Sequence, residues 1–335
     1  AALFNNTTGA SNTAIGRSAL QDNTTASYST AVGFKSMCTN TTGVANNAFG
    51  AFSLLNTTTG KANVAIGGCN VGAYGASLES NTTGCCNVAV GTGALRNNTT
   101  ANDNTAVGTL ALINNTTGAD NVAVGKNALY ANITTGLNTA IGTNALCSHN
   151  ANGVDNTAVG HGALKGSTEG YYNTAVGKNA LSNVTTGDNN LGFGRDSGVD
   201  AVRNITSGDN EIVIGNNSHG SAFIKIDWTV TSDLRDKTEV KDVTHGLDFV
   251  NQITPIEYRF KKSREDDTPT GLTKYGFSAQ EILELEGENP VIINNQDADN
   301  LKLTSAYLVP VLVNAIKELK AQNKDLKSRI EALET

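Results

Sequence analysis

Two residues in the last third of the chain have the chemistry of a nucleophile and its base. Ser232 and Lys237 lie five residues apart in Thr231-Ser-Asp-Leu-Arg-Asp-Lys237. A serine hydroxyl becomes a nucleophile when an adjacent base accepts its proton, and a lysine serves as that base when burial or a nearby cation lowers its pKa. Arg235 is a candidate for that cation. Taken alone, this spacing is explained by chance and surface exposure, so the pair needs support from the surrounding sequence.

The other residues capable of chemistry show no comparable pattern. The four histidines show no ligand spacing with the cysteines, so the sequence predicts no metal site. The cysteines are odd in number and poorly matched in position, which favours small buried or scattered residues over a disulfide framework. They are Cys38, Cys69, Cys85, Cys86 and Cys147. Glycosidases need a pair of carboxylates, but the acids of the first 200 residues are scattered among predicted turns. We expect no cofactor.

These residues are embedded in a chain dominated by one repeat. Residues 12 to 215 carry a five-residue phrase twelve times, of which Asn12-Thr-Ala-Ile-Gly16 is the first. Most copies follow one another after 17 residues, with longer intervals of 24 residues before Gly91, 18 before Gly160 and 21 before Gly215. A fixed short period is typical of a solenoid. Each copy has a β-branched run, an Ala-Leu pair and an Asn-x-Thr-Thr-Gly turn, so we expect two short strands and two turns per coil.

The repeat also predicts how coils pack. Ten of the twelve phrases begin with Asn, and stacked Asn side chains can hydrogen-bond along the axis. Strand alternation places Ala and Gly on one face and Ile or Val on the other. We expect the Ile and Val face to form a thin core and the Ala and Gly face to admit a neighbouring chain. Such a thin coil favours an oligomer over a monomer.

Composition limits the partners. Aromatic residues make up 5% and charged residues 16% of the 335 residues, which suits repetitive β-structure better than an ordinary enzyme core. The net charge of −7 argues against a duplex nucleic-acid partner. No stretch of about 20 apolar residues exists, so no membrane span is predicted. The chain begins at Ala1 rather than Met, which indicates a fragment.

Composition changes near residue 220, where Gly and Asn become rarer and charged residues increase. Residues 222–230 alternate and predict a strand, with Trp228 as a core or interface residue. Residues 309–333 form a heptad zipper, in which Asn323 is a polar insert that sets register. Its two seams are Val309, Ile316, Asn323, Ile330 and Leu312, Leu319, Leu326, Leu333. By side-chain type alone these seams favour a two-stranded coil.

The repeats in residues 5–215 resemble the head repeats of trimeric bacterial adhesins and similar repeats in phage fibres. The resemblance rests on the Asn-Thr-Ala-Ile-Gly phrases with Ala-Leu and Thr-Thr-Gly between them. It implies a parallel β-roll in which three chains pack side by side.

Four blocks after residue 231 resemble the C-terminal intramolecular chaperone auto-processing domain of phage endosialidases and tailspikes. Beside the Ser232 segment, the blocks are residues 246–260, 275–282 and 304–319. The resemblance implies that Ser232 attacks the Thr231–Ser232 bond and that Lys237 acts as base, supported by Asp233 and Arg235. Asp236 departs from the family pattern, which has an apolar residue there. An acidic neighbour should raise the pKa of Lys237 and slow cleavage.

Together these observations predict a mainly β protein, a trimeric parallel β-roll of about 17-residue repeats followed by a small α+β domain that ends in a coiled-coil helix. Because both resemblances are to trimers, we expect a homotrimer. The expected division is 1–219 for the roll, 220–231 for a linker strand, 232–307 for the auto-processing domain and 308–335 for the coiled coil.

The expected function is attachment of a virus or phage fibre in the virion to a host cell-surface receptor or glycan. The 24-residue interval contains Tyr74, an aromatic residue suited to stacking on a sugar or peptide. Two alternatives stay open. One is a cellular trimeric adhesin that is extracellular or at the cell surface, and the other is the non-catalytic part of a glycan-degrading tailspike.

Overall fold

The computed structural model describes residues 1–68, 74–150, 152–200, 203–219, 223, 225, 230–262 and 264–334. It divides into two compact units, Ala1–His219 and Gly220–Thr335. The expected strand at 222–230, with Trp228, lies mostly outside the described residues.

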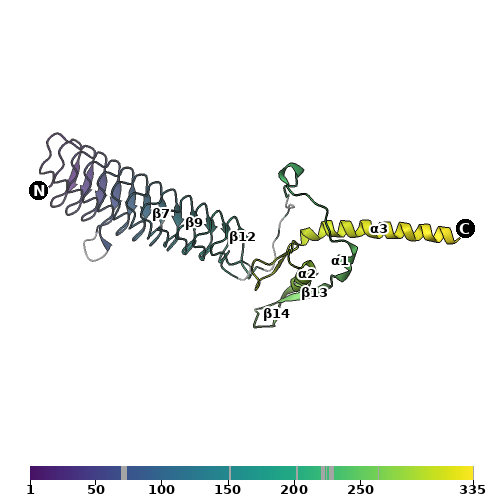
Figure 1. Cartoon of the computed structure of the whole chain (residues 1–335). Helices are drawn as coiled ribbons and strands as arrows, with labels where there is room; N and C mark the ends of the chain where they lie inside the picture. Colours follow the sequence, from purple (N-terminus) through teal and green to yellow (C-terminus); the bar gives the residue numbers. More distant parts are fainter. Residues whose placement is uncertain are drawn as a thin grey trace. The chain divides into compact units, whose positions relative to one another are not determined.

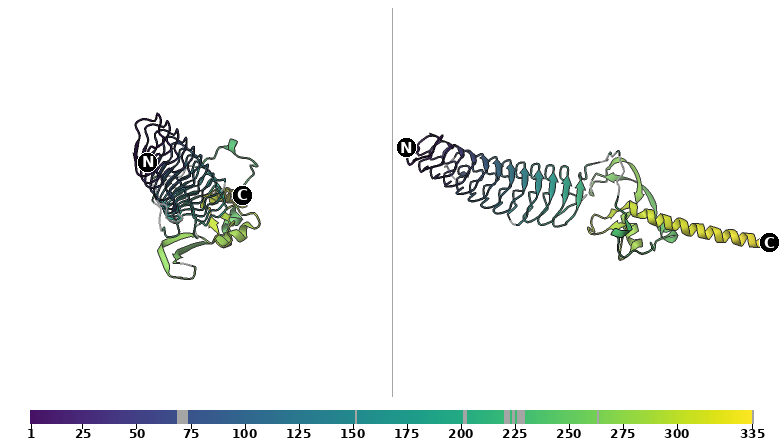
Figure 2. Two further views of the ribbon diagram at one scale, coloured as in Figure 1. Left: turned by 90° about the vertical axis from the view of Figure 1, so that its left-hand side faces the viewer. Right: turned by 90° about the horizontal axis from the view of Figure 1, so that it is seen from above.

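The first unit is a solenoid with one strand per coil, and the strands form a 12-stranded parallel sheet in sequence order (Figures 1 and 2). Equivalent residues pair in each step, as Ala106 does with Ala123. The expected solenoid of about 17-residue repeats is confirmed. The strands are β1 (Thr13–Ile15), β2 (Thr30–Val32), β3 (Asn47–Phe49), β4 (Val64–Ile66), β5 (Val88–Val90), β6 (Thr105–Val107), β7 (Val122–Val124), β8 (Thr139–Ile141), β9 (Thr157–Val159), β10 (Thr174–Val176), β11 (Leu191–Phe193) and β12 (Ile212–Ile214).

The expectation of two strands per coil is wrong, because the Ala-Leu pair lies in a turn. The leucine of the pair has a left-handed backbone, with φ of 51° at both Leu112 and Leu129, and an extended strand cannot contain that conformation. The leucine amide still bonds to the next coil, since Leu112 N donates to Ala128 O at 3.0 Å. The segment is therefore a stacked turn.

The glycine that ends each phrase is required by close approach as well as by its backbone angle. Gly125 has φ of 131°, and a Cβ placed there would lie 2.7 Å from the carbonyl oxygen of Gly142 in the next coil. Any side chain would separate the two coils. The recurrence of this glycine follows from stacking.

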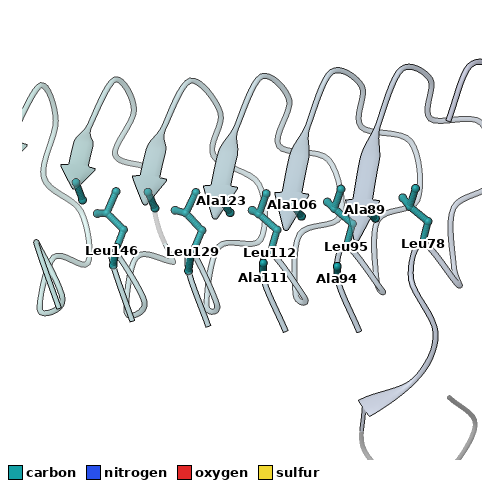
Figure 3. Close-up of a cluster of buried hydrophobic side chains, with 14 of the residues drawn as sticks. Leu78, Ala89, Ala94, Leu95, Ala106, Ala111, Leu112, Ala123, Leu129 and Leu146 are labelled. Carbon is teal, nitrogen blue, oxygen red and sulfur yellow. The ribbon is translucent and has the colours of Figure 1, made fainter. Parts of the chain in front are cut away.

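The assignment of the two strand faces was also wrong. The central alanine of the strand points inward, and Ala106 and Ala123 are 0% exposed. They pack against the leucine of the following turn to form a continuous column (Figure 3). The flanking Ile, Val and Phe side chains point away from the core, and Ile66 is 43% exposed. The core is thin because the turn brings leucine back toward the sheet, which favours a small residue opposite it, alanine in ten of the twelve strands.

Two columns of buried asparagines run along the solenoid, and the expected ladder is confirmed. In the column that precedes the strands, Asn121 Nδ2 donates to Asn104 Oδ1 at 3.1 Å and to Thr135 O at 2.9 Å. In the turn column, Asn115 Nδ2 donates to Asn98 Oδ1 at 3.0 Å. Each of these side-chain amides thus donates one hydrogen bond to the equivalent Asn of a neighbouring coil and one to a turn carbonyl. Buried polar groups require such partners.

The second unit is a small α+β domain that ends in a long helix (Figure 1). Its core joins Phe249 and Ile282 to Leu308 and Val311, which come from three helices. Its elements are η2 (Leu234–Asp236), α1 (Leu247–Gln252), β13 (Pro255–Lys261), β14 (Pro269–Phe277), α2 (Ala279–Glu286), β15 (Ile293–Asn294), β16 (Lys302–Leu303), η3 (Ser305–Tyr307) and α3 (Leu308–Leu333).

Candidate self-cleavage site

A short turn holds the residues around Ser232. Asp233 is the N-cap of η2, and its carboxylate accepts a hydrogen bond from Arg235 N at 2.9 Å. The turn closes with a bond from Lys237 N to Leu234 O at 3.1 Å. An aspartate at this position satisfies an amide that has no partner inside the helix. Asp233 therefore stabilises the turn that follows Ser232.

The turn brings Ser232 and Lys237 together. Lys237 Nζ donates to Ser232 Oγ at 2.9 Å. Both side chains are exposed, as is Thr231, whose carbonyl belongs to the bond before Ser232. The distance is within the range for proton transfer between a nucleophile and a base. The site in one chain therefore has the geometry of a dyad but no cover from solvent.

Arg235 has a different partner from the one expected. Its guanidinium binds the Asp233 carboxylate, with Nη2 to Oδ2 at 2.5 Å. This side-chain hydrogen bond lowers the pKa of Asp233, and the same bond raises the pKa of Arg235. Asp233 and Arg235 thus stabilise the turn that carries Ser232, and the Arg235 charge is directed at Asp233.

Two polar residues that no motif in the sequence marks connect α3 to the start of α1 and to the segment before it. Asn314 Nδ2 donates to His245 O at 3.0 Å and to Val243 O at 3.2 Å. Leu247 N donates to Glu318 Oε2 at 2.7 Å. Their spacing of four residues places both on one side of α3, which is the signal that could have indicated them.

The heptad seams of α3 are not covered within this chain. Leu308, Val311 and Ala315 are buried against the rest of the unit, whereas Ile316 is 65% exposed and the other seam positions are exposed as well. One side of α3 therefore belongs to the domain core, and the zipper side is an exposed apolar stripe of the kind found in coiled-coil seams.

The remaining candidates are dispersed. Tyr74 is 52% exposed beside the undescribed residues 69–73. The described cysteines (Cys38, Cys85, Cys86 and Cys147) are free, and Cys38 alone is buried. Within the described residues, no cluster of His, Cys, Asp or Glu could hold a metal ion. No helix among them is long and apolar enough to span a membrane.

Comparison with known proteins bears on the second unit. No curated protein and no solved structure matches the chain. Residues 232–289 match the family described as Chaperone of endosialidase, a peptidase family by the name of its model. The matched segment begins at Ser232 and follows the β-solenoid. The similarity of this chain to the chaperone-of-endosialidase family is thus confined to residues 232–289.

Proposed function

We propose that this chain is a homotrimeric fibre or spike segment with which a virus or phage attaches to a host surface. Its C-terminal module, 232–307 with the coiled coil 308–335, acts as an intramolecular chaperone that drives trimerisation. It then releases itself by cleaving the Thr231–Ser232 bond. The observation that carries the proposal is that the chaperone match begins at Ser232, the residue hydrogen-bonded to Lys237.

The proposed cleavage proceeds in two steps. Ser232 Oγ attacks the carbonyl carbon of Thr231 while Lys237, as a neutral amine, accepts the hydroxyl proton. The C–N bond breaks, the nitrogen of Ser232 gains a proton, and the Thr231 acyl group is left as an ester on Ser232 Oγ. Water then hydrolyses the ester, which leaves a carboxylate on Thr231 and a free amine on Ser232.

Assembly supplies what the single chain lacks. A lysine acts as a base at neutral pH when it is removed from water, and Lys237 is exposed in one chain. Packing of three copies around the η2 turn would remove that solvent. Cleavage would then follow trimerisation, after the chaperone has completed its task.

A chaperone is useful because the solenoid does not specify its own register strongly. Adjacent coils have nearly the same sequence, so a slip of one coil loses few contacts. The α3 seam joins the three chain ends first and fixes their alignment. The solenoid coils can then assemble from a defined start.

The chaperone role predicts different results for removal before and after folding. A chain expressed as residues 1–231 should aggregate, whereas the full chain should give a trimer, of three times 34.7 kDa, by light scattering. After assembly, release of 232–335 should leave a trimer that resists heat and detergent. A soluble, trimeric 1–231 made without the module would contradict the chaperone role.

For attachment, we propose contact at the 24-residue interval that contains Tyr74. Regular coils leave no room for a pocket, and an exposed tyrosine in an insertion can stack on a sugar. Tyr74→Ala should weaken binding of labelled trimer to host cells without changing its melting temperature. Tyr130→Ala, which removes a 40% exposed tyrosine from a regular coil, is the matched control. Equal binding by both variants would remove Tyr74 from the contact.

A further inference from the structure

The outward face of the solenoid sheet carries an apolar column along its whole length. The third residue of every strand is Ile, Val or Phe, as in Val107, Val124 and Ile141. Several are strongly exposed, including Phe193 at 55% and Ile214 at 64%. Monomeric proteins rarely leave so long an apolar face open to water.

Two columns of residues border this face, and they differ in charge. The start edge is the residue two positions before each strand, and the end edge is the residue two positions after it. The start edge is Ser11, Tyr28, Ala45, Ala62, Cys86, Asp103, Asp120, Leu137, Asp155, Tyr172, Asn189 and Asn210. The end edge is Arg17, Phe34, Ala51, Gly68, Thr92, Thr109, Lys126, Thr143, His161, Lys178, Arg195 and Asn216.

The start edge has three aspartates and no cation, whereas the end edge has four Lys or Arg residues, one histidine and no acid. Asp120 and Lys126 are exposed, and neither forms an ion pair within the described part of the chain. Arg195 pairs with Asp196 in its own chain. Apart from Arg17, which follows β1, the charged residues of both edges lie in the same part of the solenoid, from Asp103 before β6 to Arg195 after β11.

The opposite edges of one chain cannot neutralise each other. Asp120 and Lys126 are separated by β7, and six extended residues span up to about 20 Å. The turns that carry the end edge are stacked in register from coil to coil. Asn144 N donates to Lys126 O at 2.9 Å, and Asn179 N donates to His161 O at 2.8 Å. Each edge is thus a regular row with a spacing of about 4.8 Å per coil.

The relation between the edges selects an orientation for a neighbouring copy. A rotation axis parallel to the solenoid brings the start edge of one copy against the end edge of the next. An antiparallel neighbour would bring like edges together, with acid against acid and cation against cation. Opposite charges attract and like charges repel, so the charges favour the parallel arrangement.

We propose that the apolar strand face is covered by parallel copies of this chain, with the acidic start edge of each copy against the basic end edge of its neighbour. The inference rests on the proposed homotrimer and adds its interface. In register, Asp120 meets Lys126 and Asp155 meets His161. A stagger of one coil instead joins Asp103 to Lys126 and Asp155 to Lys178. A second copy fits this face because it repeats the same spacing through all twelve coils.

Cross-linking tests the contact directly. A carbodiimide joins a lysine to a carboxylate only where the two already touch, so it cannot link these edges within one chain. Trimer assembled from a mixture of ¹⁵N-labelled and unlabelled chains should give mixed-isotope cross-links from Lys126 or Lys178 to an aspartate of the start edge. A trimer without these cross-links would overturn the proposed interface and leave the trimer itself intact. A monomeric protein would overturn both.

Charge reversal provides a second, independent test. Reversing the three start-edge aspartates with Asp103→Lys, Asp120→Lys and Asp155→Lys should lower the melting temperature of the trimer at low salt. Adding Lys126→Asp, His161→Asp and Lys178→Asp to the same chain should restore it, because opposite charges then face each other again both in register and with a stagger of one coil. The differences should shrink near 1 M salt, where the Debye length is about 3 Å.

The matched control is Lys165→Asp, which reverses an exposed charge on the solenoid away from both edges and should change the trimer little. The interface is wrong if the start-edge variant melts like the native trimer. It is also wrong if the combined variant is less stable than the start-edge variant.

Discussion

Among single residues, His149 interrupts the buried turn column. It occupies the position that Asn115 and Asn132 hold in the two preceding coils, and it is 0% exposed. His149 Nε2 contacts Gly153 O at 2.7 Å, so Nε2 carries the proton. Nδ1 has no hydrogen-bond partner in the described structure. Burial lowers the pKa of His149, because a second proton would place a charge in the core.

This histidine predicts acid sensitivity. The unfolded chain binds the proton near pH 6.5, whereas the folded chain binds it only at lower pH. The stability contributed by neutral His149 is therefore complete above about pH 6.5 and is lost as pH falls toward the folded pKa, by up to about 1.4 kcal/mol per pH unit. His149→Asn should lose less melting temperature than the native chain between pH 7.5 and pH 5. Equal losses would show that the pKa of His149 does not differ between the folded and unfolded chain.

At the scale of elements, the period could be predicted but the inward face could not. The twelve phrases gave the twelve strands, and their first residues gave the Asn ladder. Alternation alone gave no sign whether Ala or Val faces inward, because the answer depends on the turn. Leu112 adopts a left-handed backbone and returns to the sheet, which favours a small residue such as alanine at the centre of the strand. That backbone angle contradicts the local preference of leucine and is imposed by the stacking of coils.

The candidate site around Ser232 could likewise be predicted only in part. The blocks around Ser232 predicted the chaperone-of-endosialidase match, and the resemblance, rather than the spacing alone, indicated that Ser232 and Lys237 act together. The pairing of Arg235 with Asp233 was not predicted, because it depends on the 3-10 turn rather than on sequence distance. The α3 seam was predicted from its heptads, and its exposure fits a helix whose other side packs on the domain core.

At the scale of the whole molecule, the two units have different proposed lifetimes. The solenoid has a buried column of alanine and leucine and satisfied Asn ladders, which suit a permanent fibre. The second unit has a small core and an exposed zipper, which suit a chaperone module that aligns three chains and is then released. In the proposed function, the exposed pair Ser232 and Lys237 connects the two roles, because the proposed chemistry requires the cover that the proposed assembly would supply.

The cut at Thr231–Ser232 tests this account most directly. Intact mass spectrometry of the assembled protein should find residues 1–231 and a fragment 232–335 that begins with Ser232. Ser232→Ala and Lys237→Ala should assemble but stay whole, and Asp236→Leu should cleave faster than the native chain. An assembled native trimer that is never cut, or a Ser232→Ala trimer cut at the same bond, would contradict the proposal.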